Sequence, residues 1–213
     1  MSTTERRRGR FISFEGLDGS GKTTQTRLLA ERLRAQGREV IIAVEPGGTR
    51  VGEQIRAILL DVNNYELAPE AELLLYFASR AQNVAEVIRP ALECGAIVLA
   101  DRFTDSTIAY QGYGRGLGEA VVRQLHRIAC GDLFPDLTLL LDVDPEIGLA
   151  RARGRGALNR MDDQAREFYR KVREGYRALA RAEPARFRVI DAAAGIEEVA
   201  RAVREAVGPF LSD

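Results

Sequence analysis

A glycine-rich octapeptide between an apolar run and an amphipathic run is the feature that most constrains this chain. Residues 16–23 read GLDGSGKT and fit the pattern G-x-x-x-x-G-K-[ST]. The run Phe11–Glu15 before it is typical of a buried strand, and residues 23–36 after it carry leucines at helical spacing. This order predicts backbone amides and a helix N-terminus aimed at a phosphate group. The motif indicates nucleoside triphosphate binding and leaves the reaction open.

Further apolar runs and amphipathic stretches alternate along the rest of the chain. The apolar runs predict strands at 40–44, 96–100, 137–143 and 187–190. The amphipathic stretches predict helices at 51–60, 69–94, 118–131, 145–153, 163–182 and 196–211. Continuous apolar strands between helices are typical of a parallel sheet covered on both faces. The sequence therefore predicts an α/β fold with a five-stranded parallel sheet and helices on both faces, as in P-loop nucleoside triphosphate hydrolases.

One domain is expected over residues 11–213, preceded by a flexible polar tail at 1–10. The irregular stretches 45–50, 101–118 and 153–162 follow strands or lie beside them. In an open parallel sheet, ligands bind at the carboxyl ends of the strands. We therefore expect functional residues in these stretches and in the glycine-rich loop.

The charge of the chain limits its partners. It has 31 basic and 31 acidic residues and a pI near 6.7, which argues against a protein coated by nucleic acid. No apolar run reaches the roughly 18 residues of a membrane span, and the tail lacks the apolar core of a signal peptide. Neither nucleic acid nor a membrane is an expected partner, and a cytoplasmic location fits.

Cysteine and histidine are scarce. Cys94 and Cys130 allow no disulfide framework or zinc cluster, and both are expected to be buried, unreactive thiols. His126 is the single histidine, and we expect it on a helix surface. Histidine-dependent general base catalysis is therefore disfavoured.

Motifs that the chain lacks exclude several classes of nucleotide-binding protein. No Asn-Lys-x-Asp occurs for guanine selection, and remodelling ATPases are usually longer than 213 residues. A small chain with a phosphate loop and further arginine-rich loops is typical of a small-molecule kinase. Such an enzyme neutralises two phosphorylated substrates and excludes water from the γ-phosphate.

Several segments resemble those of the thymidylate kinases, which phosphorylate dTMP with ATP. The resemblance runs in order from about residue 11 to about residue 205. The glycine-rich loop is shared with many families, whereas the Glu-Pro-Gly-Gly-Thr, Asp-Arg-Phe and Ala-Tyr-Gln motifs are far more selective. The segments are FEGLDGSGKTT at 14–24, EPGGT at 45–49, FASRAQ at 77–82, DRF at 101–103 and STIAYQG at 106–112.

The resemblance implies an ATP site at the glycine-rich loop, with Mg²⁺ as cofactor. Lys22 is expected on the β- and γ-phosphates, and Thr23 and Asp101 on Mg²⁺, directly or through water. The expected catalytic residues are Lys22, Asp101, Arg102 and Arg153. The expected ATP-binding residues are Gly16, Leu17, Asp18, Gly19, Ser20, Gly21, Lys22, Thr23, Thr24, Arg151 and Arg155.

The same resemblance implies a dTMP site beside ATP. Arg102 is expected to bridge the donor and acceptor phosphates, and Arg56 to grip the monophosphate. Asp18 would face the 3′-hydroxyl of the sugar or nearby phosphate ligands, and Tyr110 would crowd its 2′ side, favouring deoxyribose. The remaining expected dTMP-binding residues are Glu45, Pro46, Tyr76, Phe77, Arg80, Ser106, Thr107 and Gln111.

Base recognition is expected from one helix face and one loop. Tyr76 and Arg80 are four residues apart and share a helix face. By the resemblance, the aromatic ring stacks on thymine and the arginine reads a base carbonyl, with Phe77 as the alternative stacking residue. Thr107 and Gln111 are expected to bond the base edge. An ordinary core role is the alternative for either aromatic residue.

Residues 151–160, RARGRGALNR, predict an arginine-rich lid. Glycines give hinge freedom, and guanidinium groups can close on the triphosphate. Which of Arg151, Arg153 and Arg155 contacts the transferred phosphoryl group is left open, with Arg153 preferred. Lid arginines together with a non-basic phosphate loop resemble the bacterial branch of the family. A solvated basic loop is the alternative.

The resulting hypothesis is a thymidylate kinase that transfers the γ-phosphoryl group of ATP to dTMP, giving dTDP and ADP, with a homodimer implied by the resemblance. One alternative is a kinase for another nucleotide or nucleoside, which would keep the phosphate loop and lack the thymine pocket. The other is a nucleotide-dependent switch that acts through a partner. A panel of acceptors distinguishes the three.

Overall fold

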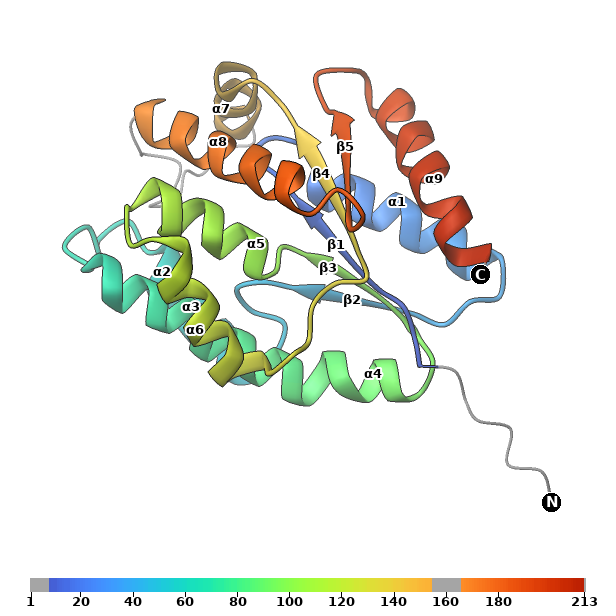
Figure 1. The fold of residues 1–213 in the computed structure, drawn as a ribbon, viewed down its shortest axis with the longest axis horizontal. Helices are drawn as coiled ribbons and strands as arrows, with labels where there is room; N and C mark the ends of the chain where they lie inside the picture. The colour runs from blue at the N-terminus through green and yellow to red at the C-terminus, as the bar shows by residue number, and fades with distance from the viewer. Residues whose placement is uncertain (1–7, 155–165, 213) are drawn as a thin grey trace.

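The computed structural model describes residues 8–154 and 166–212, so the first seven residues of the expected tail lie outside the described residues. A parallel sheet of five strands runs through the centre, in the order β2-β3-β1-β4-β5 (Figure 1). The predicted α/β architecture is confirmed. The strands are β1 (Phe11–Glu15), β2 (Val40–Val44), β3 (Ile97–Asp101), β4 (Leu137–Asp142) and β5 (Phe187–Asp191).

Helices cover both faces of the sheet (Figure 1). Helices α1 and α9 pack together on one face, while α4, α5 and α8 pack on the other, with α2, α3 and α6 beyond them. The helices are α1 (Lys22–Ala35), α2 (Arg50–Leu60), α3 (Pro69–Asn83), α4 (Arg89–Glu93), α5 (Thr104–Thr107), α6 (Glu119–Cys130), α7 (Pro145–Arg153), α8 (Arg166–Ala182) and α9 (Ile196–Ser212), and two π-helical segments are η1 (Val84–Ile88) and η2 (Ile108–Gly114).

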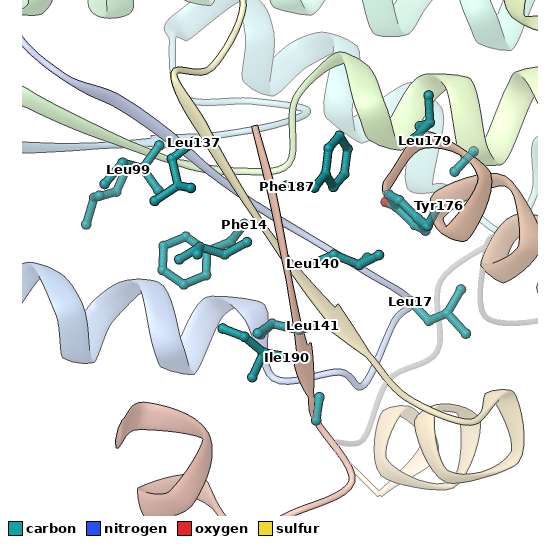
Figure 2. Close-up of a cluster of buried hydrophobic side chains, with 14 of the residues drawn as sticks. Phe14, Leu17, Leu99, Leu137, Leu140, Leu141, Tyr176, Leu179, Phe187 and Ile190 are labelled. Atoms are coloured by element: carbon teal, nitrogen blue, oxygen red, sulfur yellow. The ribbon is translucent and has the colours of Figure 1, made fainter. Parts of the chain in front are cut away.

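The side chains of β1 alternate between the two faces, as a strand requires. Phe14 lies on the α1 side, with Leu141 and Ile190, while Tyr176 and Leu179 enter the core from α8 (Figure 2). Burying each large apolar side chain contributes about 1.5–3 kcal/mol, so this core can hold the sheet between its helices. Because Phe14 faces α1, its neighbour Glu15 faces the α8 side.

The sheet register places the glycine-rich loop beside the end of β3. Strand β1 is paired in parallel with β3, and Phe14 lies opposite Asp101. The residues that follow each strand therefore emerge at the same edge, where the Arg102 amide donates to the Phe14 carbonyl oxygen at 3.0 Å. This register brings two distant motifs together.

The helix predicted at 69–94 is interrupted. Helix α3 ends at Asn83, the π-helical segment η1 follows, and α4 begins at Arg89. Pro90 has no N–H to donate to the carbonyl group four residues before it, and its ring crowds that carbonyl. A widened π-helical turn accommodates both effects.

The stretch expected to be irregular at 101–118 is helical over much of its length. Helix α5 covers Thr104–Thr107, and η2 continues it to Gly114. The composition suggested a loop, but packing against α8 decides the structure. A Cβ atom at Gly114 would meet the Phe168 and Val172 side chains, so glycine allows the close approach.

Two expectations about single residues were wrong. His126 is fully buried, because it shares one face of α6 with Val122 and Cys130 at helical spacing. Its Nδ1 lies 2.7 Å from Thr104 Oγ1, and its ring centroid lies 4.0 Å from that of Phe134. Cys94 is exposed. Cys130 is buried as expected, and burial raises the pKa of its thiol to about 12.

Within the described part of the chain, no helix is both long enough and apolar enough to cross a membrane.

Candidate active site

A cavity of about 480 Å³ opens at the carboxyl ends of β1, β2 and β3. The glycine-rich loop forms one wall, α2 and α3 form another, and α5 with η2 forms a third. Val44, Leu60 and Ala152 also line it, and these three were not among the expected site residues. The expected residues that line it are Asp18, Gly19, Gly21, Lys22, Thr23, Thr24, Glu45, Pro46, Arg56, Tyr76, Arg80, Asp101, Arg102, Ser106, Thr107, Tyr110 and Gln111.

The glycine-rich loop requires glycine for two reasons. Gly16 and Gly19 have φ angles of 139° and 76°, which L side chains rarely adopt. A Cβ atom at Gly16 would collide with the carbonyl oxygen of Leu141, and one at Gly19 with that of Gly148. The loop is therefore pressed against β4 and α7. Gly16, Leu17 and Ser20, expected at the ATP site, belong to this loop but do not line the cavity.

Lys22 begins α1 and is almost completely buried. Its Nζ donates to the carbonyl oxygens of Gly16 at 3.1 Å and Leu17 at 2.8 Å. Burial, with the nearby positive charge of Arg102, lowers the pKa of Lys22 to about 8. The ammonium group is thus poised within the loop, where an anion can replace its two carbonyl contacts.

Thr23 and Asp101 meet at the floor of the cavity. Thr23 Oγ1 donates to Asp101 Oδ2 at 2.6 Å. Mg²⁺ prefers hard oxygen ligands, and it commonly keeps several waters with only one or two protein ligands. A hydroxyl and a carboxylate oxygen side by side fit this ion. The described residues contain no cluster of three or more acidic, histidine or cysteine side chains that would form a protein-only metal cage.

Arg102 lies at the centre of the site. Its backbone φ is 75°, a left-handed conformation that is uncommon outside glycine. Nη1 donates to the Gly16 carbonyl oxygen at 3.1 Å, and Nη2 donates to Asp18 Oδ1 at 2.6 Å. Its guanidinium group lies 4.8 Å from the ring centroid of Tyr110. The arginine therefore reaches from β3 to the glycine-rich loop.

Asp18 holds two groups of the site. Its Oδ2 accepts a hydrogen bond from the Tyr110 hydroxyl at 3.0 Å, while Oδ1 accepts from Arg102. Burial disfavours the carboxylate, but the positive charges of Arg102 and Lys22 outweigh it and lower the pKa of Asp18. Asp18 is therefore ionised at neutral pH.

Arg80 forms the far end of the cavity. It is 1% exposed, and its Nε donates to Glu45 Oε2 at 2.5 Å. Its Nη2 donates to the Phe103 carbonyl oxygen at 3.2 Å. Nη1 has no hydrogen-bond partner among the described residues. A buried guanidinium nitrogen without an acceptor beside a cavity is a donor available to a ligand.

The adjacent aromatic residues of α3 take different positions. Tyr76 is half-buried and lines the cavity, whereas Phe77 is 4% exposed and belongs to the hydrophobic core. The Phe77 ring lies under the Arg80 guanidinium group, with 4.9 Å to its centroid. Successive helical residues point about 100° apart, so only one of the two can face the cavity.

Gln111 is oriented by a residue that the sequence did not single out. Its Nε2 donates to Oε1 of Glu72 at 2.8 Å, and Glu72 is fully buried on α3. Arg115 forms an ion pair with the same carboxylate at 3.1 Å. Thr107, one turn before Gln111, is also buried at the cavity.

The second helical wall supplies a further arginine. Arg56 of α2 is half-buried at the cavity, and its Nη1 donates to the Pro46 carbonyl oxygen at 2.6 Å. This bond ties α2 to the segment after β2. The cavity thus has arginines from three elements along its length, in Arg56, Arg80 and Arg102.

The expected lid arginines do not share one position. Arg151 of α7 donates to the carbonyl oxygens of Ala192 at 2.6 Å and Ala193 at 2.9 Å. Arg153 is exposed at the end of α7 and does not line the cavity. Arg155, with the rest of the expected lid to residue 160, lies outside the described residues.

Two more buried residues adjoin the site without having been predicted. Glu15, the last residue of β1, and Tyr176, on α8, both contact the surroundings of Arg102. Glu15 lies in a predicted strand and in the family segment at 14–24, where no role of its own was expected, and Tyr176 lies in the helix predicted at 163–182. An acidic residue in a fully buried strand was the available signal for the first.

Three comparisons place the chain among known proteins. Residues 14–203 match the family model of thymidylate kinase. The chain is 52% identical over 208 residues to the thymidylate kinase of Solidesulfovibrio magneticus, covering 94% of this chain and 100% of that protein. It is 55% identical over 194 residues to that of Thermomicrobium roseum, covering 91% of each. The crystal structure of thymidylate kinase from Ehrlichia chaffeensis matches with a TM-score of 0.77 and 37% identity, covering 94% of this chain and 98% of that one.

Proposed function

The chain belongs to the thymidylate kinase family, and we propose that its cavity binds dTMP beside ATP and transfers the γ-phosphoryl group between them. The products are dTDP and ADP. The observation that carries the proposal is the position of Arg102, with one nitrogen on the Gly16 carbonyl of the glycine-rich loop and the side chain against Tyr110. An arginine between two phosphate sites can neutralise both during transfer.

The glycine-rich loop is the donor end. Backbone amides at a helix N-terminus attract phosphate oxygens, and Lys22 adds a full positive charge. In the structure Lys22 Nζ is held by the carbonyl oxygens of Gly16 and Leu17. Phosphate oxygens would replace these weaker neutral acceptors.

Thr23 and Asp101 would hold Mg²⁺ through their oxygen atoms, with water and phosphate oxygens completing the ligands. When bound, the ion supplies positive charge to phosphate oxygens. The two side chains already lie within hydrogen-bond distance, so they need little rearrangement to share one cation. Direct and water-mediated binding remain alternatives within this proposal.

The opposite end is the thymine site. Arg80 offers Nη1 as a donor to a base carbonyl, and its ion pair with Glu45 holds it in place. Gln111 gives its Nε2 to Glu72, which leaves its amide oxygen as an acceptor for the base. The Tyr76 ring stacks on the base, since Phe77 is in the core. Thr107 adds a short polar group at the base edge.

The middle of the cavity takes the sugar and the monophosphate. Tyr110 and Asp18, joined at 3.0 Å, occupy the sugar region, where the tyrosine ring disfavours a 2′-hydroxyl. Arg56 grips the monophosphate from α2, and Glu45 and Pro46 shape the wall beneath it. These assignments give every part of dTMP a neighbour of matching chemistry.

No general base is needed for this transfer. An oxygen of the acceptor phosphate is already a competent nucleophile at neutral pH, so catalysis consists of positioning and charge neutralisation. Lys22 and Arg102 supply the fixed positive charge. Arg153 is the preferred lid residue for the transferred phosphoryl group, because Arg151 is engaged with two backbone carbonyl groups.

A cytoplasmic homodimer is part of the proposal. Leu74 of α3 and Val121 and Ile128 of α6 are exposed apolar side chains on two helices that pack together, and none of the three lines the cavity. Association of two copies would cover them. Light scattering coupled to size-exclusion chromatography measures the state, and a monomer at micromolar concentration would contradict it.

A coupled assay of ADP release tests the function. The acceptors are dTMP, dUMP, dCMP, AMP, GMP and thymidine, each with ATP and Mg²⁺. We expect turnover with dTMP, and weaker or no turnover with the others. Best turnover with another acceptor would overturn the thymine site, and ATP binding without acceptor-dependent turnover would overturn the kinase assignment.

The chain offers a matched control for the phosphate loop. Lys22 and Lys171 are its only lysines, and Lys171 is exposed on α8. We expect Lys22→Ala to lower kcat about 10³-fold, and Lys171→Ala to leave it within twofold. Equal activity of the two purified variants would contradict the assigned role of Lys22.

A further inference from the structure

Glu15 is a fully buried carboxyl group that the proposed reaction does not use. It ends β1 immediately before the glycine-rich loop, and strand alternation points it to the α8 side. Burying a carboxylate is costly unless hydrogen bonds satisfy it. The partners of Glu15 therefore indicate what it does.

Donors from two elements hold the Glu15 carboxyl group. Oε1 accepts from the Phe103 amide at 2.7 Å. Oε2 accepts from Ser106 Oγ at 2.5 Å and from the Tyr176 hydroxyl at 3.0 Å. Glu15 thus joins β1 to the start of α5 and to α8.

The same groups surround Arg102. Its Nη1 donates to Ser106 Oγ at 3.0 Å and to the Tyr176 hydroxyl at 3.2 Å. The backbone amide that Glu15 binds belongs to Phe103, the next residue along the chain. Arg102 itself has a left-handed backbone, which persists only where the surroundings hold it. Glu15 therefore supports Arg102 through both its backbone and its side chain.

The direction of the hydrogen bonds between Glu15 and the two hydroxyl groups determines what those hydroxyl groups can offer to Arg102. Each hydroxyl has one hydrogen and two lone pairs. A hydroxyl that gives its hydrogen to Glu15 turns its lone pairs toward other neighbours. Ser106 and Tyr176 can then accept from Arg102 Nη1, which has only hydrogens to offer. In its ionised form Glu15 can only accept, so it orients the hydrogens of these two hydroxyl groups, whose own oxygens lie 2.7 Å apart.

We propose that Glu15 and Tyr176 are positioning residues that fix the guanidinium group of Arg102 between the two phosphate sites. Tyr176 bonds Arg102 directly, while Glu15 acts through Tyr176, Ser106 and the Phe103 amide. Arg102 Nη2 donates instead to Asp18, so the two terminal nitrogens of the guanidinium group are held by different residues. The inference deepens the proposed phosphoryl transfer and rests on it.

Tyr176→Phe removes only the hydroxyl group. Because a hydrogen bond to a charged group is worth about a tenfold change in rate, we expect kcat about tenfold lower. The KM values for ATP and dTMP should stay within twofold, because the support matters most when charge moves between the phosphates. The control is Tyr113→Phe, since the Tyr113 ring packs against Gly175 of α8, the helix that carries Tyr176. A kcat for Tyr176→Phe equal to that of the control overturns the proposal.

Glu15→Gln keeps the shape and the acceptor for the Phe103 amide. Its new NH₂ group donates to Ser106 and Tyr176, so their own hydrogens must turn toward each other or toward Arg102. We expect a loss of kcat at least as large as that of Tyr176→Phe, with a melting temperature within a few degrees of the wild type. An unchanged kcat overturns the role of Glu15.

A double-mutant cycle separates positioning from a general effect on stability. If Tyr176 acts through Arg102, the loss from Tyr176→Phe should largely disappear in an Arg102→Lys background. If the kcat losses of the two single variants multiply in full in the double variant, the proposal is overturned. Nitrogen-15 NMR of the Arg102 Nε–H gives a readout independent of turnover, with the signal assigned by its absence in Arg102→Lys. We expect faster hydrogen exchange in both positioning variants, and unchanged exchange overturns the proposal even if no acceptor is phosphorylated.

Discussion

The hydroxyl of Thr23 donates to the carboxylate of Asp101 across 2.6 Å, joining the start of α1 to the end of β3. The two residues are far apart in the sequence, and parallel pairing of β1 with β3 brings them together. Two adjacent oxygen donors beside a phosphate loop match the ligands that Mg²⁺ prefers. The contact therefore makes a prediction about the metal dependence of the enzyme.

Asp101→Asn should raise the Mg²⁺ concentration needed for half-maximal activity about tenfold, because a neutral amide is a weaker ligand than a carboxylate. The measurement is initial rate against free Mg²⁺ at saturating ATP and dTMP. Thr23→Ser keeps the hydroxyl and serves as the conservative control, with a curve close to the wild type. An identical Mg²⁺ dependence for Asp101→Asn would remove this residue from the metal site.

The neighbours Tyr76 and Phe77 allow a paired test of the proposed thymine site. Tyr76→Ala should raise the KM for dTMP about tenfold, since stacking of an aromatic side chain on a base is worth about 1–3 kcal/mol. Its melting temperature should change little, because the ring is half-buried.

Phe77→Ala should lower stability more than it raises the KM for dTMP. It leaves a cavity in the core and should lower the free energy of unfolding by about 3–5 kcal/mol, with a smaller effect on KM. Denaturant unfolding and steady-state kinetics on both variants give the comparison. A larger rise in KM for Phe77→Ala than for Tyr76→Ala would reverse the assignment.

The lowered pKa of Lys22, about 8, predicts a pH dependence. Lysine is charged below its pKa, so the free enzyme should lose the ammonium group as the pH rises through 8. The value of kcat/KM for ATP reports the free enzyme and should fall on the alkaline side of that pH. Bound triphosphate stabilises the charged form, so kcat should fall only at higher pH. A kcat/KM profile that stays flat to about pH 9.5 would contradict the prediction.

Much of the fold could be predicted from local sequence patterns. The segment Phe11–Glu15, the helix at Pro145–Arg153 and the phosphate loop were predictable because a strand, a proline-capped helix and a glycine-rich turn each leave a short-range signal. The segment at 104–114 was not, because its glycine, serine and threonine content favours a loop. Its helical form depends on packing against α8, which only the tertiary structure supplies.

The residues of the candidate site also fall into those that the sequence could predict and those that it could not. The phosphate loop and Arg102 could be identified from motifs, and most of the residues implied by the family resemblance line one cavity. Glu72 and Tyr176 could not, because each only hydrogen-bonds another residue of the site and carries no motif of its own. Choosing between Tyr76 and Phe77 required the rotation of α3, which a sequence pattern leaves uncertain by about 100° per residue.

His126 provides a direct test of the buried core, because it is the only histidine in the chain. Burial, with nearby arginines led by Arg80, lowers the pKa of His126 from 6.5 to about 4. Between these values the unfolded chain binds the proton and the folded chain does not. The stability contributed by neutral His126 is therefore present above pH 6.5 and decreases as the pH falls toward 4.

Proton NMR of tag-free protein follows a single imidazole without assignment. We expect its chemical shift to titrate with a midpoint near pH 4 in the folded protein, or to stay constant until acid unfolding intervenes. The same chain unfolded in guanidinium chloride is the matched control and should titrate near the ordinary value of about 6.5. A midpoint at or above about 6 in the folded protein would mean that the imidazole is accessible to water. In that case the packing of α6 against Thr104 and Phe134 would be wrong.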